Sequence, residues 1–219
     1  MKFINLETWE RKEHFEFFKG FDYPNYSVSA NVELTNFYNY VKSENLPFFA
    51  SLVFVAIETI NRLPNFKLRI RGNQVVEHEI IHPIFTVMTP NKLFNFCRSE
   101  YITDYNAFIE HTLKVTEISK NGALSISNGE NVDDCIYITS LPWVSFTQVV
   151  HPIFMNPANS VPIITWGKYF EENNKLMLPL SVQAHHGLID GIHMAEFFEL
   201  FQELLNDFAK MHRSIKQVA

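Results

Sequence analysis

Hydrophobic and polar positions along this chain repeat in two ways, every second residue in some regions and every third or fourth in others. Residues 26–34 alternate between apolar and polar side chains, which predicts a half-buried strand. The run after Pro47 is apolar on nearly every side, which predicts a deeply buried helix. Pro47 is expected at the first position of this helix, and Pro64 is expected to end it.

Helical spacing predicts further helices. Thr8 is expected to cap a helix over residues 9–19 that Gly20 closes, and Thr103 to cap another that reaches about residue 119. A short helix is expected from residue 35 or 36 to 43, and a closing helix over residues 192–208. The apolar positions that the closing helix should turn inward are Phe198, Phe201, Leu205 and Phe208.

Strands are predicted between these helices, with hairpin turns at Gly72-Asn73 and Asn173-Asn174 and a loop over residues 120–134. Because strands and helices interleave irregularly, the expected fold is an α/β fold with a mixed sheet covered by helices, not a doubly wound parallel sheet. The expected strands cover residues 66–70, 75–79, 84–88, 135–140, 144–149, 163–170 and 176–184.

Composition narrows the classes of protein to consider. A chain of 219 residues favours one domain, residues 1–219, with a sizeable core. The 21 Phe residues suit a packed core and aromatic-walled pockets. The net charge is −6 and there is no basic cluster, so no nucleic-acid partner is expected.

Neither a membrane nor a metal is expected. The apolar run over residues 48–57 is too short to span a bilayer, and the charged N-terminal stretch does not resemble a signal peptide. Cys97 and Cys135 lie far apart and fit no metal-ligand spacing, so reduced thiols are expected. We expect a soluble, cytoplasmic protein.

The sharpest chemical feature is His185-His186-Gly187-Leu188-Ile189-Asp190-Gly191, between a predicted strand and the closing helix. A neutral imidazole can take a proton at physiological pH, as the attack of an alcohol or thiol on a carbonyl requires. Asp190 is expected to cap the helix or pair with a cation, and the two glycines to allow a tight turn. The alternative is that both histidines are ordinary polar residues at a strand end.

His-His-x-x-x-Asp-Gly resembles the motif of the CoA-dependent acyltransferase superfamily, and further segments resemble chloramphenicol acetyltransferases in particular. The resemblance implies a two-layer α/β sandwich, a homotrimer with active sites between subunits, and acetyl-CoA as cosubstrate without a permanently bound cofactor. The resembling segments are collinear and cover residues 9–17, 82–87, 140–146, 162–169 and 178–183.

The resemblance also implies catalytic roles. His186 matches the general base that deprotonates the acceptor hydroxyl, and Asp190 matches a structural residue paired with Arg11. Thr139 stands where the family has a Ser whose hydroxyl stabilises the oxyanion, and Ser140 is the alternative donor.

Contacts to the cosubstrate are implied in the same way. Thr165 matches a position close to the reacting centre. Lys168 and Tyr169 match positions near CoA, where Lys can meet a phosphate and Tyr can stack on adenine. The alternative is that these two are ordinary strand residues.

The acceptor pocket is expected to have aromatic walls, which suit a flat aryl substrate. Asp22, Pro24 and His151 also match pocket positions, and Asp22 and His151 stand where the family usually has apolar side chains. An unpaired buried carboxylate is costly, so Asp22 is expected to be exposed, paired or part of an altered pocket. The other residues expected in the pocket are Phe17, Phe18, Tyr26, Thr86, Phe94, Val149 and Ile163.

The sequence therefore leaves four functions to consider. The first is O-acetylation of chloramphenicol, which confers antibiotic resistance, and the second is acetylation of another small hydroxyl compound. The third is the catalytic domain of a dihydrolipoamide acyltransferase. Two features argue against it: the lipoyl domains usual in that family are missing, and Gly187 stands where that family often has Arg. The fourth is a catalytically inactive trimeric binding protein, against which stands the complete set of His186, Asp190 and Arg11.

Overall fold

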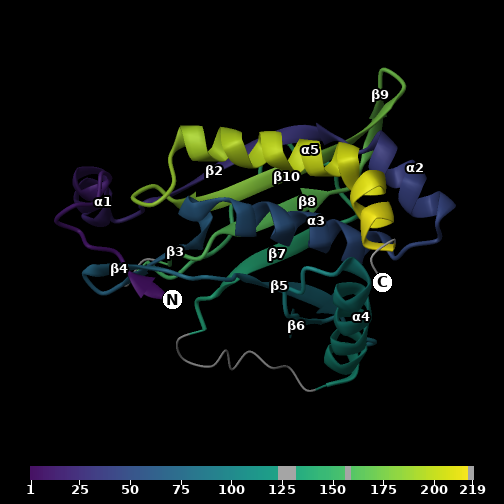
Figure 1. The fold of residues 1–219 in the computed structure, drawn as a ribbon, viewed down its shortest axis with the longest axis horizontal. Coiled ribbons are helices and arrows are strands. Elements are labelled where there is room, and N and C mark those ends of the chain that lie inside the picture. The colour runs from purple at the N-terminus through teal and green to yellow at the C-terminus, as the bar shows by residue number, and fades with distance from the viewer. Residues whose placement is uncertain (123–131, 156–158, 217–219) are drawn as a thin grey trace.

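A mixed sheet forms the centre of the protein (Figure 1). The computed structural model describes residues 1–122, 132–155 and 159–216. In the main sheet the strand order is β2-β10-β8-β7-β5-β6, with β9 paired to β10 at one end. The pairs β5–β7 and β7–β8 are parallel and the others antiparallel. The strands are β2 (Asn25–Glu33), β5 (His82–Met88), β6 (Phe94–Arg98), β7 (Cys135–Leu141), β8 (Ile163–Gly167), β9 (Phe170–Glu172) and β10 (Lys175–His185).

Helices cover one face of this sheet, as Figure 1 shows for α3 (Phe48–Arg62) and α5 (Gly191–Lys216). The short helix α2 (Thr35–Ser43) lies against α5, and α4 (Tyr105–Asn121) lies against β6 and α3. Helix α1 (Lys12–Lys19) lies at one end of the molecule (Figure 1). The arrangement is a two-layer α/β sandwich, which confirms the predicted fold class.

The core lies between the helices and the sheet. Ile138, Ile164 and Val182 are register partners on adjacent strands, and all three belong to one buried apolar cluster with residues of α3 and α5. The middle of α3 is buried throughout, as its all-round apolar pattern predicts. In α5, Phe201, Leu205 and Phe208 are buried, and Phe198 is only partly so.

The opposite face of the sheet carries a row of hydroxyl groups. Thr139 is the register partner of Thr165, Thr165 of Ser181, and Ser181 of Ser29. Register partners share a face and successive residues alternate between faces, so these four side chains point away from the helices. The sequence pattern alone did not reveal this row because it arises from four separate strands.

Residues 144–149 lie over this polar face. The prediction that they form a strand is wrong. The main chain at Val144 crosses close to β8, where its carbonyl accepts a hydrogen bond from the Lys168 N–H at 2.8 Å. A Cβ at Gly167 would lie 2.7 Å from the Val144 carbonyl oxygen, so only glycine permits this approach. Apolar and polar residues alternate here, but the segment pairs with no described strand, and Val144 is exposed.

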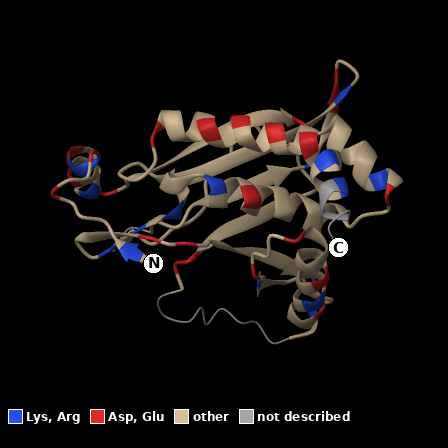
Figure 2. Ribbon diagram, viewed as in Figure 1, with Lys and Arg blue, Asp and Glu red and all other residues tan. Residues whose placement is uncertain are grey.

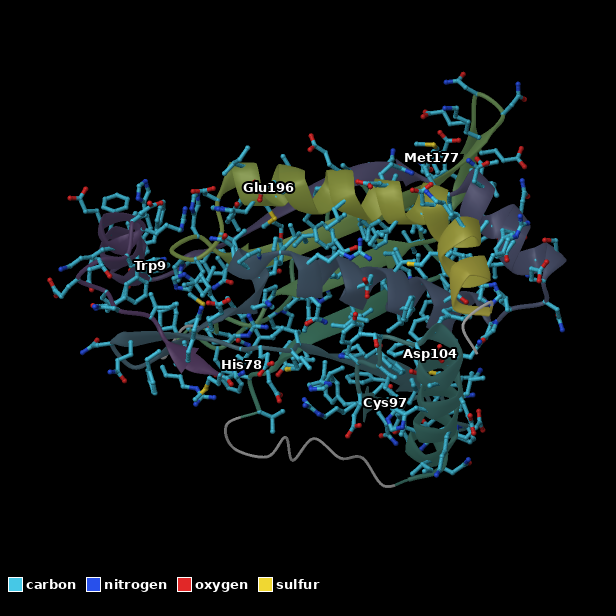
Figure 3. All side chains as sticks on the ribbon, viewed as in Figure 1. Trp9, His78, Cys97, Asp104, Met177 and Glu196 are labelled. Carbon is cyan, nitrogen blue, oxygen red and sulfur yellow. The ribbon has the colours of Figure 1, made fainter. Side chains whose placement is uncertain are left out.

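Two predicted helix caps are also wrong. Helix α1 begins at Lys12, and the Thr8 hydroxyl donates to the Asn5 carbonyl instead of capping a helix. Helix α4 is capped by Asp104, whose carboxylate accepts from the Ala107 N–H at 2.8 Å, and not by Thr103 (Figure 3). At α4 the adjacent polar residues Thr103 and Asp104 made the choice ambiguous from sequence, whereas α1 has no side-chain cap.

Other boundaries differ by smaller amounts. Pro47 is the N-cap of α3 and not its first helical residue. Residues 163–170 divide into β8 and β9, and the predicted turn at Asn173-Asn174 follows, with φ of 52° and 61°. Strand β6 and the short β1 (Lys2–Phe3) were not predicted. Of the predicted loop over 120–134, residues 123–131 lie outside the described residues.

A second sheet, in the order β1-β4-β3, lies beside the main one. The predicted hairpin consists of β3 (Leu68–Arg71) and β4 (Gln74–Glu77) and turns at Gly72, which has a φ of 61°. A 3-10 turn, η1 (Pro64–Lys67), precedes it. The fully buried Arg69 guanidinium donates to the main-chain carbonyls of Phe66, Leu68, Asp133 and Cys135, which ties this hairpin to β7.

Charged residues are spread over several elements (Figure 2). The outer side of α5 carries a row of acidic residues, including Glu199, Glu203 and Asp207. Among the residues that the structure describes, no helix is both long enough and apolar enough to cross a membrane.

Candidate active site

His186 follows the last residue of β10 and its ring lies between two aromatic rings. The Phe18 ring stacks on one side, with centroids 4.0 Å apart and an interplanar angle of 10°, and Tyr26 stacks on the other at 4.4 Å and 27°. The His186 N–H donates to the Pro24 carbonyl at 2.8 Å. Within the described residues Nδ1 is buried without a hydrogen-bond partner, so Nε2 is the nitrogen left to act on a substrate.

His185, in contrast, is a structural residue. It is 2% exposed, and its Nδ1 accepts a hydrogen bond from the Gly187 N–H at 3.1 Å. Its carbonyl accepts from the N–H groups of Leu188 and Ile189. Burial, and then the neighbouring His186, lower the pKa of His185 to about 4. His185 is therefore neutral at physiological pH and shapes the turn that carries His186.

At position 187 of this turn there is no room for a side chain, so a glycine is required. A Cβ there would lie 3.1 Å from two ring atoms of His185 and 3.5 Å from the Phe15 Cα. Gly191 has nothing within 4 Å of such a Cβ, and neither glycine has a φ in the left-handed region. The expectation that the two glycines allow a tight turn thus holds for Gly187, where a Cβ would crowd the His185 ring, whereas nothing within 4 Å of Gly191 requires a glycine there.

Asp190 connects the turn to two other elements. Its Oδ2 lies 2.6 Å from Nη1 of Arg11, at the start of α1, and its Oδ1 lies 2.7 Å from Nδ1 of His193 in α5. Burial by itself would raise the pKa of Asp190, but the Arg11 hydrogen bond and charge outweigh it and hold that pKa below its ordinary value. The Arg11–Asp190 pairing is as predicted, whereas His193 was missed although the three-residue spacing on a helix could have indicated it.

The Tyr26 hydroxyl lies in the same charged environment. Burial, and then the Asp190 carboxylate, raise the pKa of Tyr26 to about 12. Tyr26 is therefore protonated at physiological pH, and it contributes an aromatic wall for His186.

Thr139 lines a large cleft of about 1450 Å³. The cleft is walled by β5, β6 and β7, by the start of α3, by α4, and by the segment that follows β7. Ser140 also lines it, but Thr139 shares a face of β7 with the hydroxyl row and Ser140 is the register partner of the core residue Trp166. Most other lining side chains are apolar, among them Phe48, Phe49, Phe94, Phe96 and Ile163.

The predicted catalytic residues thus fall into two groups in one chain. Thr139 lines the cleft, whereas His186, Phe18 and Tyr26 do not. The predicted base and the predicted oxyanion donor therefore do not share this cavity within a single chain.

Comparison with known protein families shows the family to which this chain belongs. The family model described as "Chloramphenicol acetyltransferase" matches residues 1–202. The chain belongs to the chloramphenicol acetyltransferase family. A chloramphenicol acetyltransferase of Clostridium perfringens is 31% identical over 213 residues, which are 95% of this chain and 97% of that protein. Chloramphenicol acetyltransferase 3 of Escherichia coli is 28% identical, over 94% of this chain and 98% of that protein.

Solved structures show the same fold. A chloramphenicol acetyltransferase structure superposes with a TM-score of 0.86 at 26% identity and covers 93% of this chain and 99% of its own. The cubic core of the pyruvate dehydrogenase multienzyme complex has a TM-score of 0.67 at 20% identity, covering 86% of this chain and 84% of its own. The latter likeness shows a common fold alone.

The three residues predicted to contact CoA lie at different depths. Thr165 is 1% exposed and does not line the cleft, since His151 covers its hydroxyl. Lys168 and Tyr169 are exposed just after β8. The Tyr169 ring lies 6.3 Å from that of Phe48, which lines the cleft, so an aromatic surface continues from the cleft to Tyr169.

The acceptor residues that the family resemblance implied divide in the same two groups. Thr86, Phe94 and Ile163 line the cleft with Thr139. Phe17 is exposed beside Phe18, with ring centroids 5.1 Å apart, and Asp22 is exposed, which was one of the three outcomes expected for it. Val149 is half-buried and does not line the cleft. Pro24 is buried and holds the His186 main chain.

Proposed function

We propose that this protein transfers the acetyl group of acetyl-CoA to a hydroxyl of chloramphenicol, with His186 as general base. The observation that carries the proposal is the complete histidine loop, in which an imidazole with one free nitrogen lies on a turn held by Arg11 and Asp190, in a member of this family. Both named relatives above are chloramphenicol acetyltransferases matched over nearly their whole length.

The reaction needs no covalent acetyl-enzyme. Nε2 of His186 takes the proton from the acceptor hydroxyl as its oxygen attacks the thioester carbon, which forms a tetrahedral oxyanion. The Thr139 hydroxyl donates a hydrogen bond to that oxyanion. When the intermediate collapses, the C–S bond breaks, the ester forms, and the imidazolium returns its proton to the thiolate of CoA.

The division of the site between two surfaces supports a homotrimer. The cleft with Thr139 belongs to one subunit of 219 residues, and His186 with Phe18 and Tyr26 comes from its neighbour. Exposed apolar side chains near the cleft, such as Trp143, Val150 and Phe154, would be covered in such an assembly. We place the trimer in the cytoplasm because acetyl-CoA is an intracellular metabolite.

The alternative is the same reaction on another small hydroxyl compound. The observation behind it is His151, a polar side chain in a mostly apolar cleft, which other hydroxyl compounds with a polar group could also match. Catalysis by Arg11, Asp190 and His186 would be unchanged, and only the acceptor would differ.

A thiol-release assay tests the proposal. Purified protein with acetyl-CoA should release CoA thiol only when chloramphenicol is present, and mass spectrometry should detect acetylchloramphenicol. His186→Ala protein, purified in parallel, should release no thiol above background. Turnover with a panel of other alcohols but not with chloramphenicol would favour the alternative, and no turnover with any alcohol would overturn acetyl transfer itself.

A further inference from the structure

His151 lies on the cleft wall and has no part in the mechanism above. Its Nε2 is 2.6 Å from the Thr165 Oγ1. Its main-chain N–H donates to Oε1 of Gln183 at 2.8 Å, and its carbonyl accepts from Nε2 of the same side chain at 3.3 Å. Imidazole and backbone are thus both fastened to the polar face of the sheet.

The groups that hold His151 are themselves fixed. Thr165 and Gln183 are 1% and 2% exposed, and they stand on the adjacent strands β8 and β10. Buried side chains on paired strands have little freedom, so the orientation of the imidazole is set by the sheet. Because Nε2 contacts Thr165 and the residue lines the cleft, Nδ1 is the ring nitrogen left to bind a ligand there.

Nδ1 is a hydrogen-bonding atom with no partner within the described part of the chain. Burial lowers the pKa of His151, which favours the neutral ring. A neutral imidazole bonded through Nε2 offers Nδ1 either as donor or as acceptor, depending on the direction of the Thr165 hydroxyl hydrogen. The nearby wall is apolar, with Ile153, Phe154 and Ile163, so a ligand that enters would displace water from Nδ1.

His151 is also close to the reacting centre. Thr165, which holds His151, is the register partner of Thr139 on the neighbouring strand. Adjacent strands are about 4.8 Å apart. An acceptor whose hydroxyl reacts at Thr139 would therefore bring atoms within a few bonds of that hydroxyl close to His151.

We propose that His151 is a specificity-determining residue that hydrogen-bonds the acceptor through Nδ1, so that the enzyme takes alcohols carrying a second hydroxyl or an amide close to the acetylated oxygen. The inference rests on the proposed acetyl transfer and adds to it the substrate class. A simple alcohol would leave Nδ1 desolvated and unpaired, and a site built around a hydrogen bond discriminates strongly against such ligands. Chloramphenicol, which is an amide-bearing diol, belongs to the accepted class.

Two substitutions separate a ligand contact from a structural role. In His151→Asn the side-chain amide can reach the position of Nδ1 but not Thr165. In His151→Gln it can reach the position of Nε2, and so Thr165, but not that of Nδ1. Steady-state kinetics should show His151→Gln raising the KM for chloramphenicol by about tenfold, because a buried hydrogen bond is lost. His151→Asn should stay within about threefold of wild type, and neither variant should change the KM for acetyl-CoA.

A second measurement compares acceptors. The ratio of kcat/KM for chloramphenicol to that for 2-phenylethanol, an aryl alcohol with one hydroxyl, should fall by about tenfold in His151→Leu. His111→Leu, a substitution on α4 outside the cleft lining, controls for removal of a histidine. Rescue by Gln and not by Asn, or an unchanged acceptor ratio in His151→Leu, would overturn the inference while acetyl transfer stands. Absence of transfer by the wild-type enzyme would instead overturn the proposed function, and the inference with it.

Discussion

Nη1 of Arg11 lies 2.6 Å from Oδ2 of Asp190, across 179 positions of sequence. The two side chains are 15% and 26% exposed, so this ion pair is largely shielded from water. It joins the start of α1 to the turn that carries His186. Because Phe18 of α1 stacks on the His186 ring, the helix whose N-cap residue is Arg11 also orients the imidazole of His186.

This pair should contribute a measurable coupling energy. Arg11→Met or Asp190→Asn alone removes one partner of a partly buried ion pair and should destabilise the protein by about 3 kcal/mol. A double-mutant cycle by urea denaturation should give coupling above about 1 kcal/mol. The exposed pair of Lys12 and Glu7, 3.0 Å apart, is the matched control and should couple by less than that. Equal coupling in both cycles would argue against a structural role for Arg11 and Asp190.

His186→Ala should lower kcat by about 10²- to 10⁴-fold, because a general base contributes on that order. The circular dichroism spectrum should be unchanged, since the side chain makes no hydrogen bond to the described residues. His14→Ala, on the exposed side of α1, is the control and should keep wild-type activity. If His186→Ala kept near wild-type turnover, the base would have to be sought elsewhere.

Substitutions of Thr139 and of Ser140 should differ in their effect on kcat. Thr139→Val keeps the shape and removes the hydroxyl, so kcat should fall by about 10²-fold or more. Thr139→Ser should retain most activity, because the donor remains. Ser140→Ala should have little effect, since Ser140 shares a strand face with core residues. A large loss in Ser140→Ala with an active Thr139→Val would assign the oxyanion to Ser140.

Mixing subunits should test whether the site is shared. His186→Ala and Thr139→Val proteins should each be nearly inactive. When they are unfolded together and refolded, a wild-type His186 from one subunit can meet a wild-type Thr139 from its neighbour. About a quarter of the sites should then regain activity by random assembly. If both groups acted within one chain, the mixture would be no more active than its parts, which are refolded separately as the control.

His185 should make folding stability depend on pH. Its pKa falls from 6.5 in the unfolded chain to about 4 in the folded one, so between these values the unfolded state binds more protons. Stability is therefore full above pH 6.5 and declines as the pH falls toward 4. His185 should account for a loss of about 2 kcal/mol between pH 7 and pH 5, measured by urea denaturation at constant protein concentration.

The matched variant is His185→Asn, whose Oδ1 can still accept the Gly187 N–H. It should show a flatter dependence over the same interval, whatever its absolute stability. If the stability of the wild type and that of the variant changed with pH in parallel, His185 would not be held neutral by the fold.

The sequence by itself determined the elements with strong periodic patterns and the motif of the histidine loop. The buried helix α3, the alternating strand β2 and the hairpins at Gly72 and Asn173-Asn174 follow from local side-chain patterns and turn chemistry. The Arg11–Asp190 pair was anticipated only through a family resemblance, because no local pattern connects residues so far apart.

Tertiary structure decided everything that depends on neighbours from other strands. The path of residues 144–149 was mistaken for a strand because its apolar residues alternate, although its backbone passes over β8 through the space left by Gly167. The contact between His151 and Thr165 could not be read from the chain either. Strand order and register, set by packing between distant segments, bring those two side chains together and place Thr139, but not His186, on the cleft of one chain.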